Sequence, residues 1–456
     1  MGPTLVPKDG RTRDAPGDGA DGQGPRPRAL PWRQEHQPGW LPNGVRLFVA
    51  VLVLFQLIQG LVDSPRIANS PFTRSYYLIT YNHGFVRRGL IGEGFRLIVG
   101  VPTVSEVDGA ADLVAILAIG SVLFLIELLI RRGSPESCSM AILLAASPFI
   151  VDYIVVDRRP DLLAIPALVA LGFILMAKTR GHIVWWLGGM GLVFGALALV
   201  HEDVLMIELP WAIVLVTVAT LGQGDDAAGR GGSPPVKVLV ERLAALVVPS
   251  AIAAVALVIY GLPNAEKVAK LRADVSGFPL QGGTMFEYLP DTLRKSIDRV
   301  GSIPQSVALH TIALCLLLLI PQLAWVVFWG RSGLTAIFTR QGHRAIGLAL
   351  GAVVVIPMFA LFATGVDWLR WLCGCGTSWL VVQSFSILLL APARRNVEGR
   401  DNRIVAGDGR PAVVAEWPDR VGLSLWMPAL AVYLAAIPPI DVSLTAGLLR
   451  HFFVFF

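Results

Sequence analysis

One polar stretch combines residue types that could bind and activate a charged substrate. Residues 81–94 read YNHGFVRRGLIGEG and lie between hydrophobic segments. Adjacent guanidinium groups, here Arg87 and Arg88, can hold a phosphate or carboxylate through paired hydrogen bonds. His83 can donate to the same anion, and Glu93 can act as a general base. Glycines let the backbone come close to a ligand, so the stretch indicates a site for a phosphate-bearing group.

Three further polar clusters occupy short turns between apolar segments. They are residues 157–161 (DRRPD), 201–203 (HED) and 367–370 (DWLR). The topology given below puts these turns and the 81–94 stretch on one side of a membrane. Ionisable groups at membrane depth are costly and tend to face a bundle interior or a water-filled cavity. We therefore expect the four clusters to meet in one site.

Each cluster adds candidates with definite roles. Acid–base chemistry needs a carboxylate or imidazole within reach of the reacting proton, and a leaving phosphate needs positive charge. The candidate catalytic residues are Glu202, Asp157, Glu93 and His201, the candidate phosphate ligands are His83, Arg87, Arg88, Arg158, Arg159 and Arg370, and the remaining polar candidates are Asp161 and Asp367.

Structural explanations remain open for every cluster. Asp203 can serve as the N-cap of the helix that follows it. Residues 157–161 can form a self-neutralising turn, with Pro160 starting a helix. Asp367 and Arg370 are three residues apart and can pair on one helical face. The arginines of residues 81–94 can snorkel to ordinary phospholipid.

Composition places the chain in a membrane. It has 456 residues, of which 54% are hydrophobic and only 16% charged, whereas soluble chains carry about 25% charged residues. The net charge of +5 fits the Lys and Arg excess that orients membrane proteins, so no nucleic-acid partner is expected. The four cysteines show no zinc or disulfide spacing, and a divalent metal stays open as a cofactor because no ligand set stands out.

The predicted fold is an all-α transmembrane bundle with about 11 spans. Each span is a run of about 20 apolar residues, the length that crosses a bilayer as a helix. The expected spans are 45–62, 110–130, 138–156, 162–178, 183–200, 204–221, 237–260, 307–329, 345–364, 371–390 and 422–439.

The segments between the spans complete the predicted organisation. Residues 1–44 are predicted to be a disordered cytoplasmic tail, followed by one transmembrane domain over 45–456. Residues 63–100 suit an interfacial or re-entrant helix pair on the outer side, 391–421 a cytoplasmic connector, and 261–306 a solvated outer loop, with a lid or acceptor platform as the alternative. With the N-terminus inside, 23 of the 38 Lys and Arg residues are cytoplasmic, as the positive-inside rule requires.

The motifs NHGFVRRGL (82–90), His201-Glu202 and Asp367 to Trp371 resemble bacterial membrane proteins of surface-polysaccharide synthesis. The chain also resembles, over about 45–390, the GT-C superfamily of membrane glycosyltransferases. The resemblance implies a multi-pass protein of the bacterial plasma membrane that moves a sugar from a polyprenyl-phosphate donor to a glycan or lipid acceptor. It implies an acidic base soon after the first span, where this chain offers only Asp63 and Glu93.

Two other functions use similar residues. A polysaccharide polymerase or ligase would join lipid-linked oligosaccharides and would need a large outer loop with arginines. A transporter of lipid-linked substrates would need polar residues at several depths along the spans, whereas the polar clusters here gather on one face. We therefore favour the glycosyltransferase.

Overall fold

The computed structural model is built of helices across the residues that it describes. These are 40–63, 70–150, 153–154, 158–177, 182–227, 236–280, 283–306, 308–309, 311–313, 319–320, 323, 344–365 and 367–401. The predicted tail, except for its last residues, and the predicted span 422–439 lie outside them, as does most of span 307–329.

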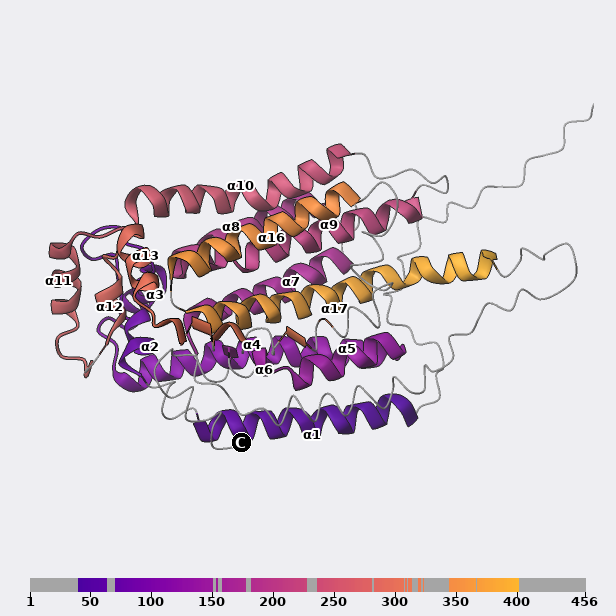
Figure 1. Ribbon diagram of the computed structural model, residues 1–456, viewed down its shortest axis with the longest axis horizontal. Coiled ribbons are helices and arrows are strands. Elements are labelled where there is room, and N and C mark those ends of the chain that lie inside the picture. Colours follow the sequence, from indigo (N-terminus) through magenta and orange to yellow (C-terminus); the bar gives the residue numbers. More distant parts are fainter. Residues whose placement is uncertain are drawn as a thin grey trace, which may run out of the picture.

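Long helices run side by side and form the body of the molecule (Figure 1). They are α1 (Trp40–Asp63), α4 (Val104–Arg132), α5 (Pro135–Ala146), α7 (Ala164–Ala177), α8 (Ile183–Val200), α9 (Glu208–Ala227), α10 (Val236–Tyr260), α16 (Arg344–Thr364) and α17 (Trp368–Asp401). Each corresponds to one predicted span. The short α6 (Pro148–Ile150) and the 3₁₀ helices η3 (Pro160–Leu163) and η4 (Glu202–Leu205) complete this body.

Within the described residues, seven helical segments are long and apolar enough to cross a membrane. They begin at Val104, Pro160, Ile183, Glu202, Val236, Ala345 and Trp368. The all-helical membrane bundle is thereby confirmed, whereas the predicted number of 11 spans is not. One reason is that the predicted span 138–156 is broken, because α5 ends at Ala146, before Pro148.

Local signals explain where the helices begin and end. Thr103 and Glu106 form a capping box at the start of α4, which satisfies two backbone donors. The same helix ends at Gly133, whose φ of 72° is readily adopted by glycine. Helix α17 continues to Asp401, eleven residues into the stretch predicted to be a connector.

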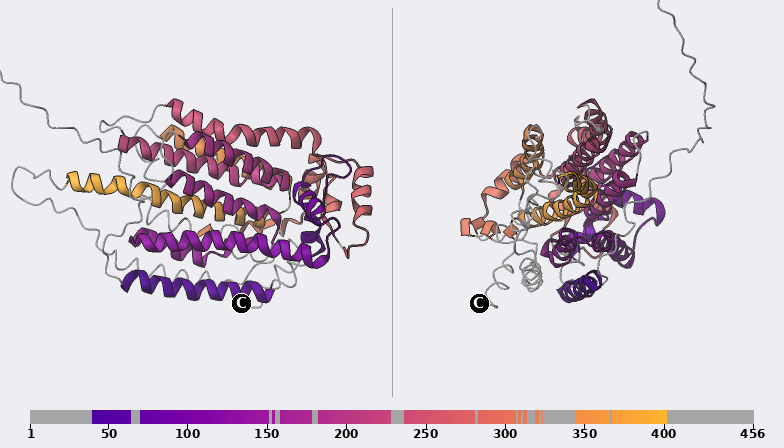
Figure 2. Two further views of the ribbon diagram at one scale, coloured as in Figure 1. Left: turned by 180° about the vertical axis from the view of Figure 1, so that it is seen from behind. Right: turned by 90° about the vertical axis from the view of Figure 1, so that its right-hand side faces the viewer.

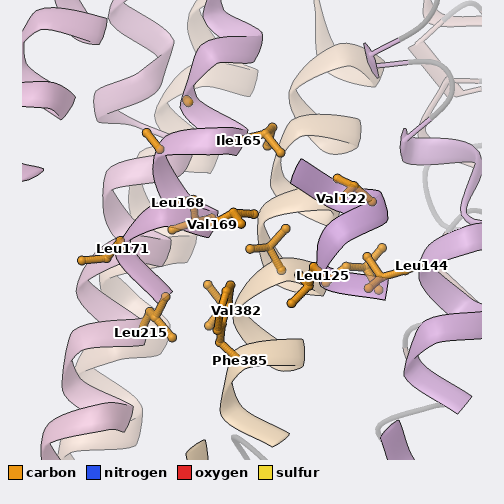
Figure 3. Packing of buried hydrophobic residues seen from close by; sticks show 14 of the residues in the cluster. Val122, Leu125, Leu144, Ile165, Leu168, Val169, Leu171, Leu215, Val382 and Phe385 are labelled. Carbon is orange, nitrogen blue, oxygen red and sulfur yellow. The ribbon is translucent and has the colours of Figure 1, made fainter. Parts of the chain in front are cut away.

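Helix α17 lies at the centre of the apolar core. Figure 3 shows its Val382 and Phe385 between Leu171 and Leu215 on one side and Leu125 on the other. A Cβ on Gly172 of α7 would lie 2.4 Å from the Phe385 ring. Only glycine therefore lets α7 approach α17 this closely.

Short helices cover one end of the long ones (Figures 1 and 2). They are α2 (Pro71–Tyr76), α3 (Leu90–Ile98), α11 (Ala265–Asp274), α12 (Met285–Tyr288) and α13 (Leu293–Gly301). We call residues 70–100 and 261–301 the cap. The helix pair predicted for 63–100 is present as α2 and α3, and its depth in the membrane remains a prediction.

The cap has its own apolar core. Tyr77 and Ile79 from the first cap segment pack with Leu271, Phe286 and Leu289 from the second. The backbone N–H of Met285 donates to Ser75 Oγ at 2.8 Å, which joins the two segments. The prediction that 261–306 is a solvated loop is therefore wrong for these residues, since distant contacts bury them.

Candidate functional site

The four polar clusters meet where the cap joins the long helices. Arg88 of the cap binds Glu202, which follows α8. Arg159, at the start of η3, binds Asp367, which precedes α17. These contacts join residues more than 100 positions apart in the sequence. Arg370 joins these two pairs, because it binds both Asp161 and Asp203. The four clusters therefore lie together, as predicted.

Glu202 is an acceptor for the adjacent cap residues Arg87 and Arg88. Arg88 donates to its two carboxylate oxygens through Nε at 2.8 Å and Nη2 at 2.5 Å. Arg87 Nη1 lies 3.5 Å from the same carboxylate, and its other donors reach the backbone carbonyls of Tyr288 and Leu289 at 2.8 Å. Arg88 is thus a paired charge facing Glu202, while Arg87 mainly fastens the cap.

Tyr76 connects the two halves of the site. Its hydroxyl oxygen lies 3.4 Å from Arg88 Nη1, Arg159 Nη1 and His201 Nε2. Both guanidiniums also face its ring, with Cζ 5.5 Å and 5.3 Å from the centroid. The site thus contains a line of hydrogen bonds from Glu202 through Arg88, Tyr76 and Arg159 to Asp367.

Arg370 lies beneath this line and is almost completely buried. Its three nitrogen atoms donate to Asp161 at 2.7 Å, Asp203 at 2.7 Å and Asp367 at 3.2 Å. The Trp371 indole donates to Asp203 at 2.7 Å. A buried charge needs such a complete set of partners because desolvation is expensive. Arg370 thus joins three of the turns, and its predicted role as a phosphate ligand remains a prediction.

The exposed fraction of the side chains separates Arg370 from the four residues above it. The side chains of Glu202 and Asp367 are 28% and 30% exposed, and those of Arg88 and Arg159 are 12% and 10% exposed. The side chain of Arg370 is only 2% exposed. A ligand could therefore reach the two carboxylates and the edges of two arginines, which we call the outer layer.

Two of the candidate arginines have strained backbones. Arg88 has a φ of 64° and Arg158 a φ of 45°, in the left-handed region that non-glycine residues seldom adopt. Such a conformation costs on the order of 1–3 kcal/mol and persists only where surrounding contacts enforce it. For Arg88, the adjacent Arg87 N–H donates to Gly261 O at 2.8 Å and supplies such a contact.

His201 is a buried imidazole whose two ring nitrogens contact different groups. Its Nδ1 accepts from the backbone N–H of Asp203 at 3.3 Å, so the proton is on Nε2, which points at Tyr76 Oη. Burial lowers the pKa of His201 well below its ordinary value, and the charges of Arg88 and Arg370 lower it further. A neutral His201 can orient Tyr76, but it is closed off from solvent.

Burial and neighbouring charges also shift the pKa values of Tyr76 and Asp367. Burial raises the pKa of Tyr76, which keeps its hydroxyl protonated. Burial alone would raise the pKa of Asp367, yet Arg159 and Arg370 outweigh it and hold the pKa below its ordinary value. Asp367 is thus a carboxylate in the resting site.

Three predicted site residues lie apart from the outer layer. Glu93 binds Arg96 of its own helix at 2.6 Å and accepts from the backbone N–H of Tyr81. His83 contacts Asp274 at 3.0 Å on the cap surface. Arg158 pairs with Asp112 of α4. These contacts explain each residue structurally, and their proposed chemical roles remain predictions; Asp157 lies outside the described residues.

The structure corrects one assignment. The N-cap of η4 is His201, whose side chain accepts from the Asp203 N–H, so the interpretation of Asp203 as an N-cap is wrong. Asp203 instead accepts from Arg370. The predicted pairing of Asp367 with Arg370 is confirmed at 3.2 Å.

Sequence reasoning missed Tyr76, Tyr153 and Glu208. Tyr76 lies in the segment 63–100 expected to form an interfacial helix pair, and Glu208 lies within the predicted span 204–221. Glu208 could have been predicted as a site residue, because acidic residues inside apolar spans are rare and are usually functional. Among the described residues, no group of three or more His, Cys, Asp or Glu side chains is arranged to hold a metal ion.

Comparison with known proteins supports the membrane assignment. Residues 45–263 match the model of a family described as "Uncharacterised membrane protein Rv1490". The chain is 33% identical over 159 residues to "Uncharacterized protein Rv1490" of Mycobacterium tuberculosis and to "Uncharacterized protein Mb1527" of Mycobacterium bovis. These matches cover 34% of this chain and 36% of each relative. The chain thus matches little more than a third of the length of these relatives.

No solved structure matches the chain. The family match includes Arg88, Arg159 and Glu202 and ends before Asp367 and Arg370, so it covers three of the four residues of the outer layer. Together with seven long apolar helices, the match to a membrane-protein family identifies the chain as a multi-pass integral membrane protein.

Proposed function

We propose that this protein is a membrane glycosyltransferase that moves a sugar from a polyprenyl-phosphate donor to a cell-envelope glycan or lipid. One observation supports this most: two accessible carboxylates, Glu202 and Asp367, stand at the ends of a line that contains Arg88 and Arg159. Glycosyl transfer needs both a base and positive charge for a departing phosphate. The outer layer contains both.

The donor phosphate exchanges with Glu202. Arg88 offers a planar pair of donors that fits phosphate as well as carboxylate. When phosphate takes that pair, Glu202 loses its strongest counterion, and its affinity for a proton rises. Donor binding thus produces the base where the acceptor hydroxyl must be deprotonated.

The sugar is then transferred by direct displacement of the phosphate. The acceptor oxygen forms a bond to the anomeric carbon while the bond from that carbon to the phosphate oxygen breaks. The hydroxyl proton passes to Glu202, and the electron pair leaves with the phosphate, which Arg88 and Arg159 stabilise. Asp367 is the second candidate base, since its side chain is as accessible as that of Glu202.

An apolar surface leads to this site. Helix α10 exposes Ile252, Val255, Val258 and Ile259 and ends next to Gly261, whose carbonyl accepts from the Arg87 N–H. A polyprenyl chain lying along this face would bring its phosphate to the cap arginines.

Binding and turnover of purified protein in lipid nanodiscs test the proposal, with polyprenyl phosphate as the binding probe and polyprenyl-phosphate sugars as donors. Glu202→Gln keeps a hydrogen-bonding side chain, so we expect donor binding to persist and turnover to fall by about 10²–10⁴-fold, the usual worth of a general base. Arg88→Lys keeps the charge but loses the paired donors, so we expect weaker binding of polyprenyl phosphate.

Glu93→Gln is the matched control. Glu93 is also a cap-side carboxylate paired with an arginine, but it lies outside the outer layer, so turnover should stay at the wild-type level. The proposal is wrong if wild-type protein neither binds polyprenyl phosphate nor transfers sugar from any such donor. It is also wrong if Glu202→Gln and Asp367→Asn each retain wild-type turnover.

A polymerase or ligase is a second candidate. The cap segment 261–301 supplies backbone carbonyls to Arg87 and so extends the site beyond the long helices, as a second large substrate would require. Product from two lipid-linked oligosaccharides, with none from a monosaccharide donor, would favour this function.

A transporter has one observation in its favour. Thr377, Ser378 and Gln383 of α17 are buried, and each has a side-chain atom without a hydrogen-bond partner in the described structure. Gln383 is 15 residues from the start of α17, or about 22 Å at the helical rise. Movement of a lipid-linked sugar across proteoliposomes without covalent change would identify transport.

A further inference from the structure

A second group of acids lies deeper than the outer layer. Tyr153 Oη is 3.2 Å from Asp161 Oδ2 and 3.2 Å from Glu208 Oε1. All three residues are about 1% exposed. They come from the segment after α6, from η3 and from the first turn of α9, so three separate elements bring them together.

The number of hydroxyl protons at Tyr153 favours one protonated carboxyl group. A neutral phenol donates one hydrogen bond and accepts others, although Tyr153 Oη lies 3.2 Å from both carboxyl groups. Tyr153 has one hydroxyl proton, which serves one of the two contacts. The other contact is favourable when the carboxyl group itself carries a proton, because two ionised carboxylates this close to one phenol would repel each other.

The surroundings assign that proton to Glu208. Asp161 has a positive partner, Arg370 Nη1, at 2.7 Å. Glu208 has no basic side chain within 4 Å among the described residues, and its charged neighbours Asp161 and Asp203 are both acidic. The N-terminus of α9 favours an anion at Glu208, but that effect is smaller than the cost of an unpaired buried carboxylate.

The number of charged groups in the cluster also agrees with a protonated Glu208. The described cluster contains five carboxyl groups, Glu202, Asp203, Asp161, Asp367 and Glu208, and four guanidiniums, Arg87, Arg88, Arg159 and Arg370. One proton on Glu208 makes this set of described groups neutral. Burial of an excess charge is thereby avoided.

We propose that Glu208 is a protonated carboxylic acid whose proton passes through Tyr153 to Asp161, so that the bundle contains a proton-storing site distinct from the outer layer. In the transfer, Glu208 gives its proton to Tyr153 Oη as Tyr153 gives its own to Asp161 Oδ2. Glu208 ends as a carboxylate, Tyr153 remains a neutral phenol, and Asp161 ends as an acid.

Asp161 can respond to such a transfer. Its Oδ1 atom is buried without a hydrogen-bond partner in the described structure, and its Oδ2 atom shares Arg370 with Asp203 and Asp367. Protonation of Asp161 weakens its hold on Arg370 and leaves the arginine more available to Asp367. The stored proton is thus coupled electrostatically to the outer layer.

Infrared difference spectroscopy across a pH titration tests the proposal without any lipid substrate, because protonated carboxyl groups and carboxylates absorb separately. We expect a protonated-carboxyl band in wild-type protein at neutral pH and its loss in Glu208→Gln. The matched control Glu266→Gln, which changes an exposed cap glutamate, should keep the band. A wild-type spectrum without the band, or its persistence in folded Glu208→Gln, overturns the proposal.

Two further measurements test the assignment to Glu208 and the path through Tyr153. If Glu208→Gln does not fold, a heavy-carbon label on glutamate carboxyls must shift the wild-type band, and an unshifted band overturns the assignment. Tyr153→Phe removes the hydrogen-bond acceptor and should move the band to higher frequency; an unchanged frequency overturns the path through Tyr153. Failure of the glycosyl-transfer assay leaves all these readouts unaffected.

Discussion

His201 illustrates how burial determines the state of a single side chain. Its ring stacks on Tyr76 with centroids 5.4 Å apart, and it has no exposed surface. Arg88 and Arg370 add positive charge around it. The His201 side chain thus contacts Tyr76 as a neutral, buried group, and its expected part in catalysis remains a prediction.

The lowered pKa of His201 predicts an acid-sensitive fold. The folded protein keeps the imidazole neutral, whereas the unfolded chain takes up a proton below about pH 6.5, the ordinary histidine value. Proton uptake then favours unfolding, so the free energy of unfolding should be greatest above that pH and fall below it. Thermal melting of purified protein between neutral and mildly acidic pH measures this loss.

His201→Gln should flatten the acid side of that profile. Glutamine stays neutral and can still donate to Tyr76. An unchanged profile in this variant would assign the acid sensitivity to another group.

The sequence predicted which residues gather but not how they pair. Short turns such as 201–203 confine their charges to the helix ends, which made the convergence predictable. Which arginine meets which carboxylate depends on helix rotation and side-chain conformation, and neither appears in a linear pattern. Glu93 is an example: the sequence offers it as a general base, whereas in the structure its carboxylate pairs with Arg96 of the same helix.

At the scale of elements, α3 shows how closely two parts of the cap pack against each other. A Cβ on Gly92 would lie 2.1 Å from the carbonyl oxygen of Ile79. A Cβ on Gly94, in the same helix, would meet nothing within 4 Å. One helix therefore provides both a test position and its control.

Gly92→Ala should lower the melting temperature, because α3 must move away from the Ile79 backbone. Overpacking of this kind costs about 1–3 kcal/mol. Gly94→Ala should be neutral or stabilising by up to about 1 kcal/mol, since alanine favours helix over glycine. Equal effects of the two substitutions would show that α3 is not packed in this way.

Predictability differed between the long helices and the cap. A run of about 20 apolar residues is a local signal, and each long helix was found from it. The cap segments are short, mixed in polarity and held by partners far away in sequence, such as Ser75 and Met285. Their burial could not be seen from either segment alone.

At the scale of the whole molecule, the cap marks one end and predicts one side of the membrane. With the N-terminus in the cytoplasm, the cap and the outer layer face outward. Glu266 on α11 has a side chain that is 72% exposed, and Arg131 is exposed near the end of α4 that lies away from the cap.

In intact cells, a membrane-impermeant thiol reagent should label Glu266→Cys. It should label Arg131→Cys only after the membrane is opened. The wild-type chain, in which Cys138 and Cys373 are buried, measures the background. The reverse pattern would place the cap inside and exclude an outward-facing transfer site.

The three-carboxylate environment of Arg370 also sets an order of events during synthesis. Asp161 and Asp203 are made 209 and 167 residues before the arginine that binds them. Until α17 emerges from the ribosome, these acids lack that counterion, so the earlier helices cannot close tightly around them at full charge. Arrival of α17 therefore acts as the closing step, and a chain stopped before Asp367 would lack the means to complete its own bundle.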